Sequence, residues 1–243
     1  MKYIGLTSNL SDGKVYINNV YVKAFTNDNI TPIIIPSHEM RSSEVLLPDE
    51  VEKIERITNA LVAQLDVLVI TGGPDISPLS YNDVFENAVN TNYNKDFFIM
   101  TLAKKFIEAG KPCIGICYGM QLLGLMYGMK IMQDINSVEI NEAHSGASMG
   151  IDKRDEPIHK VEVVGDFKEW LGVDSIYTNS HHHQAFLIDD NKNVEGIDIL
   201  AKTPKIIEAF CIVNAPIIGI QWHVEEYSDG LTAKYLIERY ILK

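Results

Sequence analysis

The first 130 positions alternate between short apolar runs and segments whose apolar residues recur at helical spacing. Three apolar runs have the length and composition of buried strands, namely Tyr3–Thr7, Ile30–Ile35 and Asp66–Thr71. Three segments have helical periodicity, namely Val15–Phe25, Asp49–Leu65 and Asn94–Ala109. Strands that alternate with helices in this way predict a parallel sheet covered on both faces.

The segment Ile114–Met132 is apolar enough and long enough to suggest a membrane span. Gln121, Lys130 and four glycines interrupt it, and Pro112 breaks its start. We therefore interpret it as a buried strand, a buried helix and a further strand, and we expect no membrane partner.

Beyond Asn136 the pattern changes to short β segments followed by one last amphipathic helix, Leu231–Leu242. The β segments are His159–Val164, Ile176–Thr178, Ile197–Ala201, Ile206–Val213 and Ile217–Trp222. We predict a single α/β domain over residues 1–243, with an open, mostly parallel sheet, helices on both faces, and a mixed or antiparallel extension in the C-terminal half.

Composition narrows the class of protein. The chain has 243 residues and a formal net charge of −12, so it has no basic surplus to neutralise the phosphates of a nucleic acid. Three cysteines do not make a disulfide framework and indicate a reducing compartment. The N-terminus lacks the apolar core of a signal peptide, so we expect a cytoplasmic protein.

The candidate chemistry starts at Gly115-Ile116-Cys117-Tyr118-Gly119, which follows an apolar run. Glycines on both sides of one reactive residue suit a sharp turn from a strand into a helix. A thiol at a helix N-terminus is also favoured as thiolate by the helix dipole. Cys117 is therefore a candidate nucleophile, whereas Cys113 fits the alternative, a buried structural cysteine.

A cysteine nucleophile needs a base, and the base needs a group that orients it. Residues two apart on an extended segment point the same way, so Glu225 can bond His223. The chain order Cys, His, Glu disfavours an α/β-hydrolase, in which the acid precedes the histidine. The alternative for this His-x-Glu pair is a solvated strand end.

The sequence leaves the roles of two further segments open. Asn179–Gln184 contains three adjacent histidines, but neighbours on an extended chain diverge, so we expect no metal there. Its side chains either line a substrate pocket or are structural polar residues. Thr71-Gly72-Gly73-Pro74 ends a predicted parallel strand, where glycine amides can approach an oxyanion, although alone it is only a turn signal.

Together these segments resemble the class I glutamine amidotransferase-like hydrolases, in particular the gamma-glutamyl-gamma-aminobutyrate hydrolase group. The resemblance covers nearly the whole chain. The matching motifs are Asn19-x-Tyr21-Val22, Ile33–Pro36, Gly72–Pro78 with Tyr81, Lys95-Asp96, Gly115–Gln121, Gln133-Asp134-Ile135, Asn179–Gln184 and Gln221–Glu225. The sequence departs from the group's pattern at Tyr118, Val224, Ser77 and Lys95. None of these departures removes a triad member, but Tyr118 and Ser77 line or adjoin the expected pocket, so they leave the exact substrate open.

The resemblance implies a cysteine-dependent hydrolase of a small gamma-glutamyl amide, with Cys117, His223 and Glu225 as catalytic triad. Backbone N–H groups of Gly73 and Tyr118 would hold the oxyanion. Gln121 would hold the glutamyl head, and His182, His183 and Gln184 would line the pocket. No metal or organic cofactor is expected.

Two other functions remain open from the sequence. One is a glutaminase subunit that supplies ammonia from glutamine to a separate synthetase partner. The other is a binding or regulatory module that kept the fold without catalysis. The amine on the leaving side and the oligomeric state, a homodimer included, are not determined by the sequence.

Overall fold

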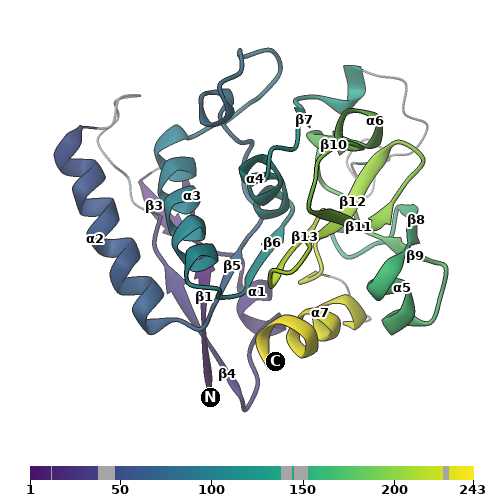
Figure 1. Cartoon of the computed structure of the whole chain (residues 1–243), viewed down its shortest axis with the longest axis horizontal. Coiled ribbons are helices and arrows are strands. Elements are labelled where there is room, and N and C mark those ends of the chain that lie inside the picture. The colour runs from purple at the N-terminus through teal and green to yellow at the C-terminus, as the bar shows by residue number, and fades with distance from the viewer. Residues whose placement is uncertain (12, 38–46, 138–143, 145–152, 227–229) are drawn as a thin grey trace.

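The computed structural model describes residues 1–11, 13–37, 47–137, 144, 153–226 and 230–243, and its centre is one large mixed sheet (Figure 1). The strand order along this sheet is β4-β1-β5-β6-β13-β12-β11-β8-β9. The parallel strands are β4 (Ile30–Ile35), β1 (Lys2–Thr7), β5 (Val67–Ile70), β6 (Cys113–Ile116) and β13 (Ile217–Ile220). The predicted parallel half of the sheet is confirmed.

The rest of the sheet is antiparallel, as expected for the C-terminal half. Its strands are β12 (Ile206–Ile212), β11 (Ile197–Lys202), β8 (His159–Val163) and β9 (Ser175–Thr178). A branch pairs β10 (Ala185–Leu187) with both β12 and β7 (Ile131–Met132). The antiparallel strands therefore extend the sheet from the edge that β13 would otherwise leave open.

Helices cover both faces of the sheet, as the alternating pattern predicts. One hydrophobic cluster contains side chains of α2 (Pro48–Gln64), α3 (Tyr93–Glu108) and α4 (Tyr118–Met126). The opposite cluster contains side chains of α1 (Asn19–Ala24), α5 (Gly165–Leu171), α7 (Leu231–Leu236) and the π-helical turn Ile237–Ile241 that continues α7. Shorter helical segments are Pro78–Tyr81, Ile135–Ser137 and α6 (Ile188–Asn191).

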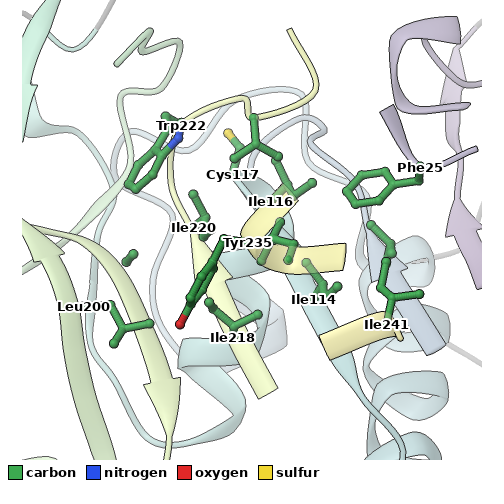
Figure 2. Close-up of a cluster of buried hydrophobic side chains, with 14 of the residues drawn as sticks. Phe25, Ile114, Ile116, Cys117, Leu200, Ile218, Ile220, Trp222, Tyr235 and Ile241 are labelled. Carbon is green, nitrogen blue, oxygen red and sulfur yellow. The ribbon is translucent and has the colours of Figure 1, made fainter. Parts of the chain in front are cut away.

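Side chains of the central strands alternate between these two clusters because successive residues of a strand point to opposite faces. Val67 and Val69 of β5 join the α1, α5 and α7 side, whereas Leu68 and Ile70 join the α2, α3 and α4 side. Figure 2 shows the first cluster, in which isoleucines of β6 and β13 lie close to Tyr235 and Cys117 lies just beyond Ile116. Both faces of the central strands are therefore buried.

The predicted helix over Val15–Phe25 is wrong in its first four residues. Lys14–Tyr16 forms strand β3, which pairs with β2 (Asn9–Ser11) in a small hairpin, and α1 begins only at Asn19. Gly13 in the hairpin turn has a φ of 68°, a conformation that glycine adopts without steric cost. The exposed side chain of Val15 then contributes to the surface, not to a helix face that packs on the core.

The turn from β6 into α4 is the tightest packing point of the sheet. A Cβ on Gly115 would overlap backbone atoms of Gly119, and a Cβ on Gly119 would overlap the carbonyl oxygen of Ile70. The two glycines thus let the start of α4 lie directly against β5 and β6. Among the described helices, none is both long and apolar enough to cross a membrane.

Cys117 stands between β6 and α4 with a φ of 52° and a ψ of −107°, a backbone conformation that residues with a side chain rarely adopt. We expect Cys117→Gly to be about 1 kcal/mol more stable than Cys117→Ala in urea unfolding, because only glycine relieves the backbone strain. Cys113 is the control, because its φ is not positive. There the alanine variant should be the more stable one. Equal stability of the two Cys117 variants would contradict the prediction.

Candidate active site

The parallel pairing of β6 and β13 brings Cys117 and His223 together from positions far apart in the chain. Ile116 is paired with Ile220, so both strands end at the same edge of the sheet. The N–H of Cys117 continues the ladder by donating to the carbonyl of Ile220 over 2.8 Å. Cys117 is the N-cap residue of α4 and is only 6% exposed.

His223 and Glu225 form the close pair that the sequence predicts. His223 Nδ1 lies 2.6 Å from Glu225 Oε1, and both residues are buried. The His223 ring also hydrogen-bonds the Cys117 thiol. Because Nδ1 already faces Glu225, Nε2 is the nitrogen available to the sulfur. The structure therefore places the three predicted triad residues in one chain of contacts.

The charge state of His223 follows from its neighbours. Burial by itself lowers the pKa of this imidazole, but the charges of Glu225 and Cys117, together with its hydrogen bonds to both, raise the pKa to about 10. At neutral pH the ring is therefore an imidazolium between two groups that carry or develop negative charge. An imidazolium beside a thiol favours the thiolate.

Asn179 fixes the backbone of His223 at two points. Its Oδ1 accepts from the His223 N–H, and its Nδ2 donates to the His223 carbonyl, each over 2.9 Å. The sequence analysis quoted Asn179 only as part of a motif and gave it no role. A complementary pair of bonds between a side-chain amide and a backbone unit cannot be inferred from sequence spacing.

Tyr21 of α1 connects this triad to the glycine loop that follows β5, and sequence reasoning missed it. Its hydroxyl accepts from the N–H of Gly72 over 2.8 Å and lies 3.4 Å from His223 Nδ1. Burial and the Glu225 charge raise the pKa of Tyr21 well above its ordinary value. The phenol is thus a neutral donor at neutral pH.

The glycine loop lies where an oxyanion site is expected. A Cβ on Gly72 would stand 2.6 Å from Cε1 of His223, so the loop backbone lies against the imidazole. The Gly72 N–H is occupied by Tyr21, whereas the described residues provide no hydrogen-bond partner for the N–H groups of Gly73 and Tyr118. The assignment of Gly73 and Tyr118 as oxyanion donors stays a prediction.

A buried cation lies beneath this loop. Lys95 is 3% exposed, and its Nζ donates to Asn9 Oδ1 over 2.7 Å and stands 3.9 Å from the centre of the Tyr118 ring. A Cβ on Gly73 would lie 2.6 Å from the same ammonium. Burial lowers the pKa of Lys95 to about 8, while the charges of Asp96 and Cys117 act in the opposite direction.

Asp96 is the buried carboxylate next to Lys95. Its oxygens accept from the Tyr118 hydroxyl over 2.7 Å and from the Ser77 N–H over 2.8 Å. Burial raises the pKa of Asp96 to about 6, despite these bonds and the charge of Lys95. The sequence departs from the family pattern at Ser77, Lys95 and Tyr118, and these three residues thus belong to one connected group. This group supports the loop and the start of α4.

The predicted substrate-binding residues are close together but mostly bonded to one another. Gln121 Nε2 donates to the carbonyl of Gln184 over 2.9 Å, and His182 Nδ1 donates to the same carbonyl over 2.9 Å. His183 Nε2 bonds Asp75 Oδ2 over 2.8 Å, and the His183 side chain is 32% exposed. Among these four, His183 is the one with substantial access to solvent, and their role in binding stays a prediction.

Two further side chains reach the His223 ring, namely His181, which belongs to the predicted Asn179–Gln184 segment, and Arg154, to which the sequence gave no role. The ring of His181 packs edge-on against the His223 ring at 5.9 Å between centroids. Arg154 places a guanidinium nitrogen 3.5 Å from His223 Nε2 while its Nε donates to Glu226 Oε1 over 2.7 Å. Arg154 is 46% exposed, so a cation stands at the outer side of the triad.

Two groups among the described residues have ligand atoms close enough to hold a metal ion. One is His223 with Glu225 and Glu226, which overlaps the triad. The other is His144 with His159 and Glu208, in the antiparallel half of the sheet.

Comparison with known proteins supports a family assignment. The model of the peptidase C26 family matches residues 2–225. The glutamine amidotransferase-like protein YvdE of Lactococcus lactis is 30% identical over 74% of this chain and 73% of its own length. Protein NtpR of Enterococcus hirae is 28% identical over 76% of this chain and 78% of its own length.

Solved structures support the fold. A glutamine amidotransferase of Thermotoga maritima superposes with a TM-score of 0.56 at 15% sequence identity, covering 98% of this chain and 82% of that one. The family match, the YvdE relative and the arrangement of Cys117, His223 and Glu225 agree with one another. The chain belongs to the peptidase C26 family and is a glutamine amidotransferase-like hydrolase.

Proposed function

We propose that the protein hydrolyses the gamma-glutamyl amide bond of a small conjugate such as gamma-glutamyl-gamma-aminobutyrate, releasing glutamate and an amine. The observation that carries the proposal is the position of the His223 ring, whose Nδ1 lies 2.6 Å from Glu225 and which interacts with the Cys117 thiol at the end of the neighbouring strand. That arrangement suits a cysteine nucleophile with a base that later acts as acid.

In the first half of the proposed reaction, the Cys117 thiolate attacks the gamma-carbonyl carbon and a C–S bond forms. The carbonyl oxygen becomes an oxyanion, which the N–H groups of Gly73 and Tyr118 stabilise by about 3 kcal/mol per donor. His223 then gives its proton to the amide nitrogen, the C–N bond breaks, and the amine leaves. A gamma-glutamyl thioester remains on Cys117.

In the second half, water attacks the thioester carbonyl and His223 takes its proton. The C–S bond then breaks, which restores the Cys117 thiolate beside the protonated His223, and glutamate leaves and releases its carboxyl proton to solvent. Glu225 orients the ring and stabilises its charged form throughout. Lys95, buried below the loop, contributes a positive charge near Cys117 that also favours the thiolate.

Arg154 favours a conjugate whose leaving amine carries a carboxylate. Its guanidinium lies beside His223 Nε2, on the side from which the imidazolium would protonate the departing nitrogen. Arginine binds a carboxylate through two parallel hydrogen bonds. An acidic amine such as gamma-aminobutyrate would place its carboxylate within reach of this side chain as it leaves.

The first test compares glutamate release from gamma-glutamyl-gamma-aminobutyrate and from free glutamine. We expect cleavage of the conjugate by the wild-type protein, glutamine nearly inert, and loss of turnover in Cys117→Ala. The control is Cys113→Ala, which removes the buried thiol of β6 and should keep turnover. Preference for glutamine that rises with a synthetase partner would favour the ammonia-supplying function.

A second test uses the pKa of His223. Glu225 raises this pKa and burial opposes it, so Glu225→Gln should lower the pKa from about 10 by about 1 to 3 units. The imidazolium would then be lost at lower pH, and the alkaline limb of kcat/KM should move in the same direction. NMR titration of the His223 ring checks the shift directly. An unchanged titration would show that Glu225 does not set the charge of the ring.

A third test addresses the leaving group. Arg154→Ala should raise KM for gamma-glutamyl-gamma-aminobutyrate about 5- to 10-fold, because a half-exposed ion pair contributes about 1 kcal/mol. The matched substrate gamma-glutamyl-butylamine lacks the carboxylate and should keep its KM. Equal losses on both substrates would instead show that Arg154 acts through His223 or Glu226.

A further inference from the structure

A second concentration of titratable side chains lies outside the triad, in the antiparallel half of the sheet. We call His144, His159, His182 and Glu208 the His–Glu cluster. Glu208 sits inside β12 and is 0% exposed, and the three histidines are between 4% and 7% exposed. His159 begins β8, and His182 lies between β9 and β10. Three segments distant in sequence therefore bring histidines to one buried carboxylate on β12.

The spacing within the cluster is too long for hydrogen bonds between charged groups. Glu208 Oε1 lies 3.5 Å from His144 Nδ1 and 3.4 Å from His159 Nε2. Charge-assisted bonds between nitrogen and oxygen are usually 2.7–2.9 Å long. The contact of Glu208 with His159 is thus a long one, and the other oxygen of Glu208 and Nδ1 of His159 have no partner among the described residues.

His182 has the orientation expected of a metal ligand. Its Nδ1 bonds the carbonyl of Gln184, which can only accept, so Nδ1 carries the proton and Nε2 bears a lone pair. That Nε2 is buried and has no partner in the described part of the chain. Its ring lies 5.1 Å from the ring of His144. A backbone carbonyl on the far nitrogen is a common feature of metal-bound histidine.

We propose that the His–Glu cluster is a structural zinc site. Zinc bonds histidine nitrogen and carboxylate oxygen at about 2.0–2.2 Å in a tetrahedron, which separates neighbouring ligand atoms by roughly 3.4 Å. The two separations at Glu208 Oε1 have this value. One ligand atom each from His144, His159 and Glu208 lie within 4.8 Å of one another. His182 is outside that group of three, and its unpartnered Nε2 would become the fourth ligand by approaching the ion.

The donor set and its burial indicate the kind of site. Three imidazoles and one carboxylate in a tetrahedron suit zinc, whereas magnesium and calcium prefer oxygen ligands only. Four protein ligands leave no open coordination position for water, so the ion would have a structural role and not a catalytic one. The sequence-based expectation of no metal considered only the adjacent histidines 181–183, and the other ligands lie on β8, on β12 and at position 144.

The proposed ion would stabilise the segment that fixes the triad histidine. The N–H of His182 and the hydroxyl of Ser180 both donate to the carbonyl of His144, and the neighbouring Asn179 holds the backbone of His223. Removing the ion should therefore loosen the connection between β9 and β10. This inference does not depend on the gamma-glutamyl substrate.

The experiment measures zinc bound to the purified full-length chain by elemental analysis after dialysis against zinc, together with the thermal midpoint. We expect about one zinc per chain in the wild type and a midpoint lowered by several degrees after chelation. Glu208→Gln and His159→Gln should lose stoichiometric zinc. His183→Gln, which removes a histidine outside the cluster, should keep it.

Absence of stoichiometric zinc in the wild type, or full zinc retention in Glu208→Gln, would overturn the proposal and identify the cluster as a hydrogen-bonded network. Wild-type protein loaded with cobalt provides a readout that needs no variant to fold. Tetrahedral cobalt absorbs strongly in the visible, and this band should be displaced stoichiometrically by zinc. A cobalt-treated protein without that band would equally contradict the site.

Discussion

The parallel pairing of β6 with β13 is the constraint on which the candidate active site depends. Ile116 pairs with Ile220, and the next hydrogen bond of the ladder comes from Cys117 itself. Because the register is fixed by buried side chains on both faces, a slip of one residue would turn each strand over. Cys117 and His223 are therefore placed by the buried central strands of the sheet, while the loops add the remaining contacts.

Placing these groups at the edge of a core requires that buried charge be paired. An isolated ion is costly to bury, whereas charges that satisfy one another can be retained. The His223 imidazolium is flanked by Glu225 and Cys117, and Lys95 lies beside Asp96. These charges lie on the two sides of the glycine loop, in which Gly72 faces the ring of His223 and Gly73 faces the ammonium of Lys95.

Much of this arrangement could be predicted from the sequence because it follows from short-range rules. The parallel strands, the glycine-flanked Cys117 and the His223–Glu225 pair depend on periodicity and on spacing of two residues. The hairpin before α1 was misread because Val15 has helical spacing while Gly13 imposes a turn. The short elements α5, α6 and β10 were missed because three to seven residues carry too little periodicity.

Contacts that join distant segments could not be read from the sequence, and the antiparallel extension supplies several of them. In strand β12 of this extension, both the backbone and the side chain of Glu208 make long-range contacts. The carbonyl of Glu208 accepts from the N–H of Gln221, two residues before His223, while its carboxylate faces the buried histidines. A change in the charge or ligation of that carboxylate would act on the same backbone that sets the position of His223. The extension therefore determines how rigidly the imidazole is held, although the parallel strands determine where it lies.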